Sequence, residues 1–511
     1  MHNEVLSFLR LPLIAWNGKS FASQAYDAVF ARIVEADRAA DDSWDKLSSP
    51  EAVRALQAEL REKGLASFGG LPERTPLNAR TTGVIQRDGY KIEKIVFESR
   101  PGYFVTGHLF IPDSPAFKPP YPGIFVPCGH SAAGKAGPGY QRGGVQGALA
   151  GFATFVVDPT DQGERFQAGQ TLVCGHGHQH TGVRAHLLGE GQAQYRIWDA
   201  MRAIDVLCER PDVDPERIGA MGMSGGGTMT SYIYAFDERV KAACPSGFLT
   251  TVRDTCQECG PQDAEQVLHG QLAFGLNHLG YMLMRFPAAA CPSFTRADFF
   301  PFRGALATVG RMKKFYEARG LGERVSYIEA PGPHNWCESS RIGSLEWMRE
   351  FLNGEKGVFP YDPMAHWREN AGFLYTNADS GIAFEPPEAG YVVPNGRIAD
   401  LPGARTIYDI LRDKYHAAVA ARPPLTRDAV LKALGPFGPA LREVLPVDEQ
   451  RPEDGKKAAQ WRCIRKALVY ADGTLVPYIA FIPTSRREAP FCSSPNPAAR
   501  LSPPKSRAIW R

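Results

Sequence analysis

The spacing of apolar and polar residues changes several times along this chain of 511 residues. Between about Ala22 and Gly64 apolar positions recur at helical spacing, which predicts helices packed against the outside of the main domain. From Thr82 to Pro112 the pattern becomes strand-like, with two β-branched and aromatic runs on either side of a Pro-Gly turn. These runs predict an antiparallel hairpin at the edge of a larger sheet.

Further along, short apolar runs bounded by glycine or proline alternate with helical patterns. The runs are 123–126, 153–157, 217–221 and 240–244, and the helical stretches are 192–210, 305–318 and 344–352. Short continuous apolar runs are typical of parallel strands buried on both faces. A further strand is expected at 325–328, and the stretch 248–285, which has no clear period, is interpreted as an insertion covering the site. The alternation predicts an α/β fold with a doubly wound, mostly parallel sheet.

One short motif lies between an expected strand and an expected helix: Gly222-Met-Ser224-Gly-Gly226. In a G-x-S-x-G turn the glycines allow close backbone approach, and the serine is held on a strained corner with its hydroxyl exposed. In a chain with 51 glycines the bare pattern is weak, and a glycine-rich turn with an idle serine is the alternative. The strand before it and the helix after it favour Ser224 as a nucleophile.

A serine nucleophile needs a base, and the base needs an orienting acid, in the chain order serine, acid, histidine. His334 follows the last expected strand and precedes a helix, which makes it the candidate base. Asp298 is the candidate acid, with a helix-capping role as the alternative. Because residues 288–296 make a poor strand before it, three other acids stay open: Asp254, Asp263 and Glu265.

An oxyanion hole requires two backbone N–H groups aimed at the developing negative charge. Gly225 is the expected first donor, because it follows the nucleophile and begins a helix. The second is expected from the loop 127–131, with His130 or Ser131 as the candidate donor. The stretch 158–165 is interpreted as a hydrogen-bonded turn that supports the elbow.

Two short stretches carry cysteines or histidines at spacings that could bind a metal. The stretch 174–180 carries three histidines at alternate positions, but no carboxylate is near in sequence, so a polar loop lining a cleft is favoured. Cys256 and Cys259 form a single CxxC, which is more often incidental. We therefore expect no metal and no organic cofactor.

Composition excludes several classes of protein. The chain is 44% hydrophobic and 22% charged with a formal net charge of +3, which gives no reason to expect a nucleic-acid partner or a charged membrane surface. There is no apolar run of about 18 residues that would span a bilayer. The ten cysteines are scattered and no convincing signal peptide is present, so a cytoplasmic location is expected unless a further N-terminal segment exists.

The hairpin pattern occurs twice. The segment Ile464–Pro483 can be laid on Glu93–Pro112 without a gap, and both end in Phe-Ile-Pro. Internal similarity of this kind indicates a second copy of one unit, here interpreted as a truncated tandem lobe with a disordered tail at 484–511. The expected division is an N-terminal helical segment at 1–80, a catalytic domain at 81–358, a linker with helices at 359–455, and a partial second lobe at 456–511.

Taken together, these residues resemble the acetyl xylan esterase-like branch of the α/β-hydrolase superfamily. The resemblance rests on the following segments: Leu71–Leu77, Gly129–Ser131, Asp161–Arg165, Trp198–Asp205, Gly222–Gly227, Asp298–Pro301 and Gly332–Asn335. It implies the triad roles for Ser224, Asp298 and His334, short acyl esters of sugars as substrates, and tandem lobes in some members.

The sequence thus predicts a serine carboxylic-ester hydrolase that works through an acyl-enzyme. A peptidase or lactone hydrolase with the same three residues is the nearest alternative. An inactive hydrolase-fold binding module is the other, because a broken strand before Asp298 would leave His334 without orientation.

Overall fold

The computed structural model describes residues 15–16, 19–167, 176–260, 262–357, 385–424, 426–434, 441–450, 461–470 and 475–483. They form two compact units, one made of residues 30–423 and the other of residues 1–29 with 424–511. The predicted disordered tail at 484–511 lies outside the described residues.

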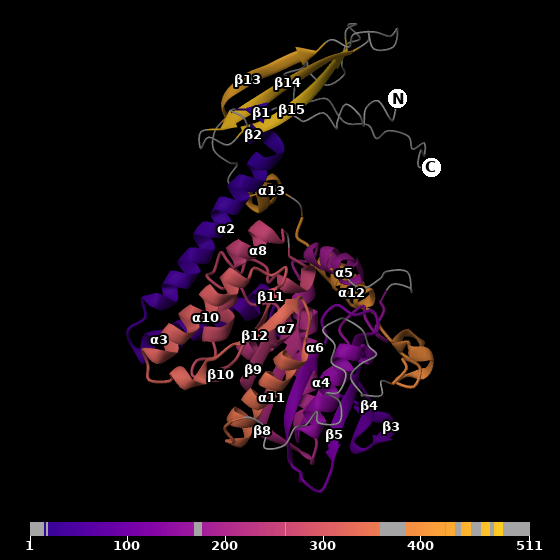
Figure 1. The fold of residues 1–511 in the computed structure, drawn as a ribbon. Coiled ribbons are helices and arrows are strands. Elements are labelled where there is room, and N and C mark those ends of the chain that lie inside the picture. Colours follow the sequence, from indigo (N-terminus) through magenta and orange to yellow (C-terminus); the bar gives the residue numbers. More distant parts are fainter. Residues whose placement is uncertain are drawn as a thin grey trace. The chain divides into compact units, whose positions relative to one another are not determined.

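The larger unit is built on one ten-stranded sheet (Figure 1). Its strand order is β12-β11-β9-β8-β6-β7-β5-β4-β3, with the short β10 beside β9. The strands from β12 to β7 pair in parallel, and β5, β4 and β3 continue the sheet as an antiparallel edge. The bounds are β3 (Arg80–Arg87), β4 (Gly89–Arg100), β5 (Tyr103–Asp113), β6 (Tyr121–Pro127), β7 (Ala153–Val157), β8 (Val213–Met223), β9 (Val240–Ser246), β10 (Ala289–Ala290), β11 (Ser293–Ala297) and β12 (Ile328–Pro333).

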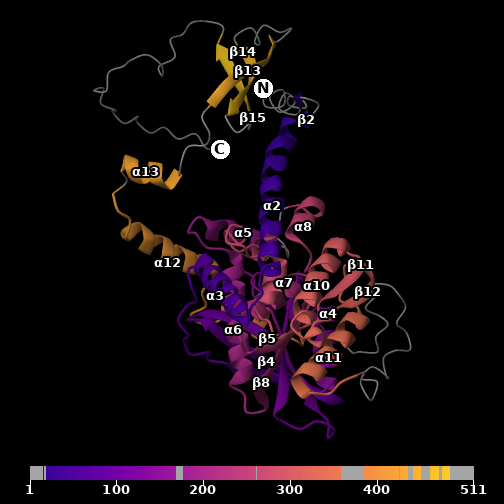
Figure 2. The same ribbon diagram turned by 90° about the vertical axis from the view of Figure 1, so that its left-hand side faces the viewer.

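Helices cover both faces of this sheet (Figures 1 and 2). Successive side chains of a strand point to opposite faces, so Ile124 and Val126 of β6 join one hydrophobic cluster while Phe125 joins another. The first cluster is closed by α4 (Pro138–Leu149) and α11 (Glu338–Asn353). The second is closed by helices α2 (Phe21–Asp45), α3 (Pro50–Ser67), α6 (Gln192–Cys208), α7 (Gly225–Phe236), α9 (His278–Leu283) and α10 (Phe302–Glu317). The predicted doubly wound α/β fold is confirmed.

Two strand predictions need correction around the last parallel strands. The strand expected at 325–328 begins only at Ile328, as β12, while Val325, directly after a short 3-10 turn (Gly322–Arg324), forms an isolated parallel bridge with Ala290. The segment 288–296, which looked too weak for a strand, contains β10 and all of β11 except its last residue, Ala297. Ser293 of β11 pairs with Ile328 on one side and with Ser246 on the other. Pairing on both sides outweighs a weak local strand propensity.

Residues 385–423 pack within the larger unit, which differs from the predicted boundary at residue 358. A buried carboxylate and a buried amide hold the segment: Glu164 accepts the N–H groups of Val392 and Val393, and Gln167 accepts that of Ile407. The short turns Pro394–Gly396 and Ile398–Asp400 lead into α12 (Ile407–Ala420). Composition alone suggested a linker, whereas these hydrogen bonds make the segment part of the domain.

The smaller unit contains a three-stranded antiparallel sheet of β13 (Leu441–Gln450), β14 (Trp461–Tyr470) and β15 (Leu475–Pro483). It also holds the strand pair Ala15–Trp16 and Lys19–Ser20, and α13 (Arg427–Leu434). Leu468 pairs with Val476 in this sheet, as Phe97 pairs with Val105 between β4 and β5. Under the gapless alignment these are equivalent pairs, so the hairpin repeat is also a repeat of strand register.

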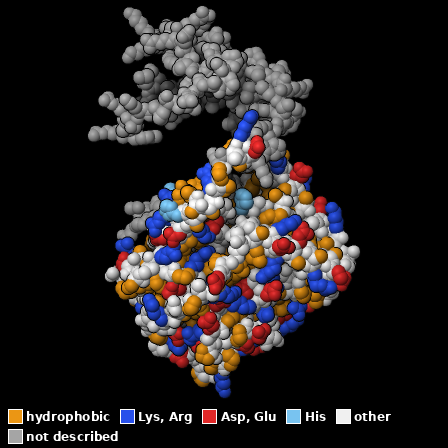
Figure 3. All heavy atoms as spheres, turned by 180° about the vertical axis from the view of Figure 1, so that it is seen from behind, with side chains coloured by type: hydrophobic (Ala, Val, Ile, Leu, Met, Phe, Trp, Pro, Cys, Tyr) orange, Lys and Arg blue, Asp and Glu red, His pale blue; other side chains and the backbone are white. Residues whose placement is uncertain are grey.

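None of the helices in the described part of the chain is long and apolar enough to cross a bilayer. On the face shown in Figure 3, the basic and acidic side chains of the described residues are interspersed. This mixture agrees with the small formal net charge of +3.

Candidate active site

Ser224 lies at the corner between β8 and α7, where the chain turns sharply at the carboxyl end of the strand. Its backbone has φ 61° and ψ −122°, a strained combination for a residue with a side chain. The N–H of Ser224 donates to the carbonyl oxygen of Ser246 at 2.9 Å, which ties the corner to β9. The side chain is only partly buried.

The glycines that follow Ser224 are required by close backbone contacts. A Cβ added at Gly226 would lie 2.3 Å from the carbonyl oxygen of Pro127, and one at Gly227 would lie 2.2 Å from that of Ser246. Both distances are far below van der Waals contact, so α7 can pack against β6 and β9 only without these side chains. The predicted nucleophile-elbow geometry is therefore present at Ser224.

Asp298 and His334 are brought together by the ends of two neighbouring parallel strands. Asp298 follows β11 and His334 follows β12, and Nδ1 of His334 donates to Oδ1 of Asp298 at 2.7 Å. The carboxylate is nearly buried, with 3% of its side chain exposed, and it also accepts from Thr295 Oγ1 at 2.9 Å and from the N–H of Phe300 at 3.0 Å. The bond to Asp298 fixes the orientation of the imidazole and keeps a proton on Nδ1. Nε2 is then the ring nitrogen that can accept a proton.

The other acids that the sequence left open lie elsewhere. Asp254 accepts from Thr251 Oγ1 at 2.7 Å, near the start of α8 (Val252–Glu258), and from Arg303. Asp263 and Glu265 face the imidazoles of His130 and His178. Asp298 is thus the acid that the structure hydrogen-bonds to His334.

The His334 ring lies beside the elbow. Its Cε1 is 3.2 Å from the position of a Cβ added at Gly247, a position that Met223, the residue before Ser224, also approaches. Nε2 is buried and has no hydrogen-bond partner among the described residues. The ring of Phe299 packs against the imidazole at 4.2 Å between centroids, and 57% of Phe299 is exposed. A buried, unpaired ring nitrogen is costly unless a substrate or a nucleophile uses it.

The loop after β6 supplies the candidate oxyanion donors. The N–H of Ser131 already donates to Oε1 of Gln162, and that of Gly129 to the hydroxyl of Tyr140. The first bond argues against the prediction of Ser131 as a donor and leaves His130 as the candidate. A Cβ added at Gly129 would lie 2.4 Å from the carbonyl oxygen of Met223 and 3.2 Å from the nitrogen of Gly225. A glycine at position 129 therefore keeps the space beside the Gly225 N–H open.

A buried charge cluster supports this loop. Nζ of Lys135 lies 2.6 Å from Oδ2 of Asp158 and 2.5 Å from Oε1 of Glu164, and all three side chains are at most 3% exposed. Burial opposes the charge on Lys135, but the two carboxylates outweigh it and raise its pKa. The stretch 158–165 was predicted to support the elbow. Its observed contacts are instead with Lys135 and with Ser131 of the candidate oxyanion loop.

A second cluster adjoins the elbow, and it was not predicted as a unit. His130, His178 of α5 (His176–His186), Asp263 and Glu265 place ligand atoms within 4.8 Å of one another. Oε1 of Glu265 lies 3.3 Å from a Cβ added at Gly225. Burial would raise the pKa of Glu265, but Arg196 and the two imidazoles outweigh it and hold that pKa well below its usual value. The sequence signal was the histidine-rich stretch 174–180, which lacked a carboxylate nearby.

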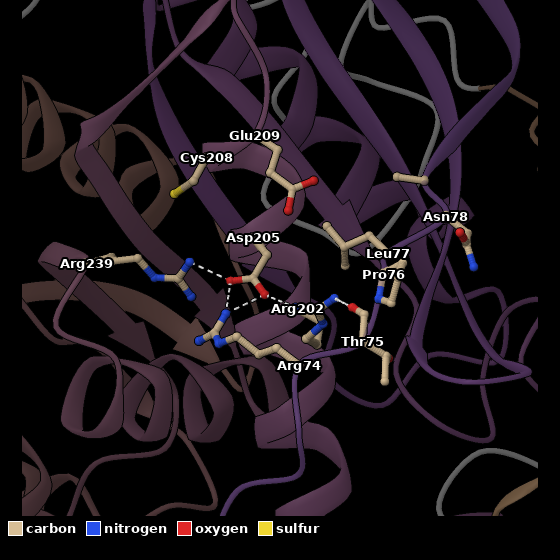
Figure 4. A pocket seen from close by; sticks show the side chains of 11 residues that line it. Arg74, Thr75, Pro76, Leu77, Asn78, Arg202, Asp205, Cys208, Glu209 and Arg239 are labelled. Atoms are coloured by element: carbon tan, nitrogen blue, oxygen red, sulfur yellow. Dashed lines mark hydrogen bonds and ion pairs between the residues drawn. The ribbon is translucent and has the colours of Figure 1, made fainter.

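A large surface pocket lies away from this chemistry. Its volume is about 660 Å³, and Arg74, Arg202 and Arg239 converge in it on the carboxylate of Asp205 (Figure 4). Arg202 also donates to the carbonyl oxygen of Thr75. Two segments on which the family resemblance rests, 71–77 and 198–205, therefore meet in an ion-pair network that ties the loop between α3 and β3 to α6.

The sheet order and the strand–serine–helix corner are those of the α/β-hydrolase fold. Residues 77–257 match the family model of acetyl xylan esterase, AXE1. The match confirms the predicted relation to acetyl xylan esterase-like α/β-hydrolases and supports the class of carboxylic ester hydrolases.

Individual relatives share little sequence identity with this chain. A protein of Bacillus subtilis (strain 168) described as a hydrolase, YtaP, is 27% identical over 201 residues, and the matched region spans 36% of this chain and 62% of that protein. Among solved structures, the methylesterase BT1017 superposes with a TM-score of 0.53 at 18% identity, covering 75% of this chain and 81% of its own. The second similarity establishes the fold.

Proposed function

We propose that this protein is a serine carboxylic-ester hydrolase with Ser224 as nucleophile, His334 as general base and acid, and Asp298 as the orienting carboxylate. The observation that carries the proposal is the 2.7 Å hydrogen bond from His334 Nδ1 to buried Asp298, beside a strained serine corner. A serine hydroxyl is a poor nucleophile at neutral pH, and an imidazole held in one tautomer is the base that activates it.

The proposed reaction is a sequence of proton transfers between Ser224, His334 and the substrate. Ser224 Oγ attacks the ester carbonyl while Nε2 of His334 takes its proton, and the imidazolium is stabilised by Asp298. Nε2 then gives the proton to the leaving alcohol, and a water activated by the same nitrogen hydrolyses the acyl-enzyme. The proposed oxyanion donors are the N–H groups of Gly225 and His130. Gly225 opens α7, and the first N–H groups of a helix have no acceptor within the helix.

Short acyl esters of carbohydrates are the proposed substrates. The acetyl xylan esterase family match supports this class. The exposed ring of Phe299 against His334 also supports it, because an exposed aromatic face beside a catalytic group is a common place for a ligand to bind.

The binding-module alternative depended on a broken strand before Asp298. The formation of β11, and the hydrogen bond between Asp298 and His334, remove the reason for preferring it. The peptidase alternative is addressed by substrate choice in the assay.

The test is hydrolysis of p-nitrophenyl acetate and of acetylated xylo-oligosaccharides, together with fluorophosphonate labelling located by mass spectrometry. Wild type is expected to label at Ser224 and to hydrolyse both. Ser224→Ala should lose labelling and turnover. Asp298→Asn should lower kcat by about 10⁴, because the amide N–H2 can donate to Nδ1 of His334 and favour the wrong tautomer, and because the negative charge that stabilises the imidazolium is lost. Aminoacyl anilides should not be cleaved.

Two matched variants serve as controls. Ser339→Ala changes an exposed serine at the start of α11, and Asp254→Asn changes a carboxylate that contacts Thr251 and Arg303 instead of His334. Both should stay within a few-fold of wild type. A folded wild-type protein that neither labels nor hydrolyses any ester would contradict the proposal.

A further inference from the structure

The cluster of His130, His178, Asp263 and Glu265 is drawn from three separate segments of the chain. His130 lies on the oxyanion loop, His178 on α5, and the two acids in the insertion at 248–285, Glu265 within a short 3-10 turn (Ala264–Gln266). Nothing in the proposed ester hydrolysis uses these side chains. Their arrangement therefore needs a separate physical explanation.

The spacing of the donor atoms fits one central cation. The two Nε2 atoms are 3.2 Å apart, and each lies 2.9 Å from a different oxygen of Glu265. Asp263 oxygens lie 3.7 Å from His130 Nε2 and 4.0 Å from His178 Nε2. Four donors about 2.0–2.1 Å from a tetrahedral ion lie about 3.3 Å from one another. The observed separations bracket this value.

Hydrogen bonds alone do not satisfy the cluster. If both Nε2 atoms carry protons, the 3.2 Å contact between them joins two donors. If one lacks a proton, its 2.9 Å contact with Glu265 joins two acceptors. Both oxygens of Glu265 are buried, and neither has a directed hydrogen bond among the described residues. With a cation between the four groups, each of these short contacts is a contact between two ligands of the same ion, and no proton is needed between them.

Burial and charge agree with this explanation. Glu265 and His178 are fully buried, and an unpaired carboxylate of that kind is expensive to keep. Arg196 lies 3.6 Å from Oε1 of Glu265, which leaves one negative charge of the two carboxylates unbalanced by a nearby guanidinium. Asp263 is 38% exposed and accepts from Gln179 Nε2 at 2.7 Å, so the open side of the cluster has both an entry path and a supporting hydrogen bond.

We propose that His130, His178, Asp263 and Glu265 bind one four-coordinate divalent transition-metal ion, with Zn²⁺ as the best match. Two imidazoles and two carboxylates are ligands that Zn²⁺ accepts in a tetrahedral site, whereas Ca²⁺ and Mg²⁺ favour all-oxygen sites. The ion would link the oxyanion loop, α5 and the insertion to one another next to Gly225, and so would hold these three segments in place beside the active site. This proposal replaces the expectation, based on sequence, that the chain has no metal.

The experiment measures metal directly. Wild-type protein is stripped with a chelator, repleted with Zn²⁺, desalted and analysed by mass spectrometry of metals, with Co²⁺ substitution as a spectroscopic probe. Wild type should retain about one ion per chain and give the visible absorption of a four-coordinate Co²⁺ site. Added Mg²⁺ or Ca²⁺ should not displace the ion.

Variants at the ligands test the assignment. Glu265→Gln and His178→Ala should abolish retention, while His180→Ala, which changes an exposed histidine two positions along the same helix, should retain the ion. If the buried variants do not fold, Asp263→Asn at the exposed side should keep the fold by circular dichroism and weaken Zn²⁺ binding about tenfold or more.

Folded wild type without saturable Zn²⁺ binding at micromolar ion would overturn the proposal. Equal binding by wild type and the folded Asp263→Asn, Glu265→Gln or His178→Ala variants would do the same. No substrate is involved in these measurements, so failure of the ester-hydrolase proposal and failure of the metal site are separately observable.

Discussion

Replacement of Lys135 by methionine tests how the charge cluster beside the proposed oxyanion loop stabilises the larger unit. Lys135 is 2% exposed and lies between the carboxylates of Asp158 and Glu164. Methionine has a similar length and no charge, so the variant removes the cation without creating a large cavity. The two carboxylates keep other donors, including Thr106 Oγ1 on Asp158 and the N–H groups of Val392 and Val393 on Glu164.

The expected loss of stability follows from burial. Removing one partner of a buried ion pair leaves an uncompensated buried charge, at a cost of about 3–5 kcal/mol. The larger unit has about 390 residues, for which the entropy of unfolding is about 0.8 kcal/mol per kelvin. The midpoint of thermal unfolding should therefore fall by about 4–6 °C.

The assay is thermal unfolding followed by circular dichroism at neutral pH, with Lys63→Met as the matched control. Lys63 also forms an ion pair, 2.5 Å from Glu59, but its side chain is 45% exposed. An exposed pair contributes at most about 1 kcal/mol, so the control should shift the midpoint by about 1 °C or less. A Lys135→Met midpoint within 1 °C of wild type, or an equal shift in both variants, would refute the reasoning.

The remaining predictions concern glycines and a buried histidine. Gly227→Ala should destabilise the protein by about 1–3 kcal/mol and lower esterase activity, because its Cβ would lie 2.2 Å from the carbonyl oxygen of Ser246; Gly310→Ala, with open space in α10, should instead stabilise by about 0.5–1 kcal/mol in the same urea titration. Gly129→Ala should lower kcat for p-nitrophenyl acetate far more than it changes KM, and an unchanged kcat would speak against the assigned oxyanion loop. Burial and the nearby Lys135 lower the pKa of His108 to about 3, and its Nε2–H donates to Gly390 at 2.7 Å. The unfolded chain takes up a proton on this histidine near pH 6.5, and the folded chain does not. Stability should therefore fall as the pH drops from 6.5 toward 3, by about 2 kcal/mol at pH 5. In urea titrations at pH 7 and pH 5, His108→Gln should reduce this dependence of stability on pH, and an unchanged dependence would exclude His108 as its cause.

Much of the fold was readable from local sequence. Buried parallel strands are short and apolar on both faces, so the runs at 123–126, 153–157, 217–221 and 240–244 predicted β6, β7, β8 and β9. The elbow at Ser224 was readable because the glycine-serine motif and the strand and helix patterns on either side of it are adjacent in sequence, although the backbone atoms that require its glycines belong to the more distant Pro127 and Ser246. The repeated hairpin was readable because side-chain alternation determines strand register.

Features that depend on contacts between residues far apart in the sequence could not be predicted in this way. β11 has weak strand propensity and forms because β9 and β12 pair with it on both sides. The hydrogen bond between Asp298 and His334 exists because those two strands end side by side, so only the sheet order could separate Asp298 from the other acids.

By itself the sequence determined the class of fold, the position of the serine corner at Ser224 and a short list of candidate acids and bases, because strand periodicity and the strand–serine–helix motif are local properties. Only the tertiary structure decided which acid meets His334, that the Ser131 N–H is already bonded to Gln162, and that residues 385–423 belong to the domain. It also brought His130 and His178 to Asp263 and Glu265, residues far apart in the chain. Contacts of this kind arise from packing of separate segments around one sheet, and no local pattern of residues records them.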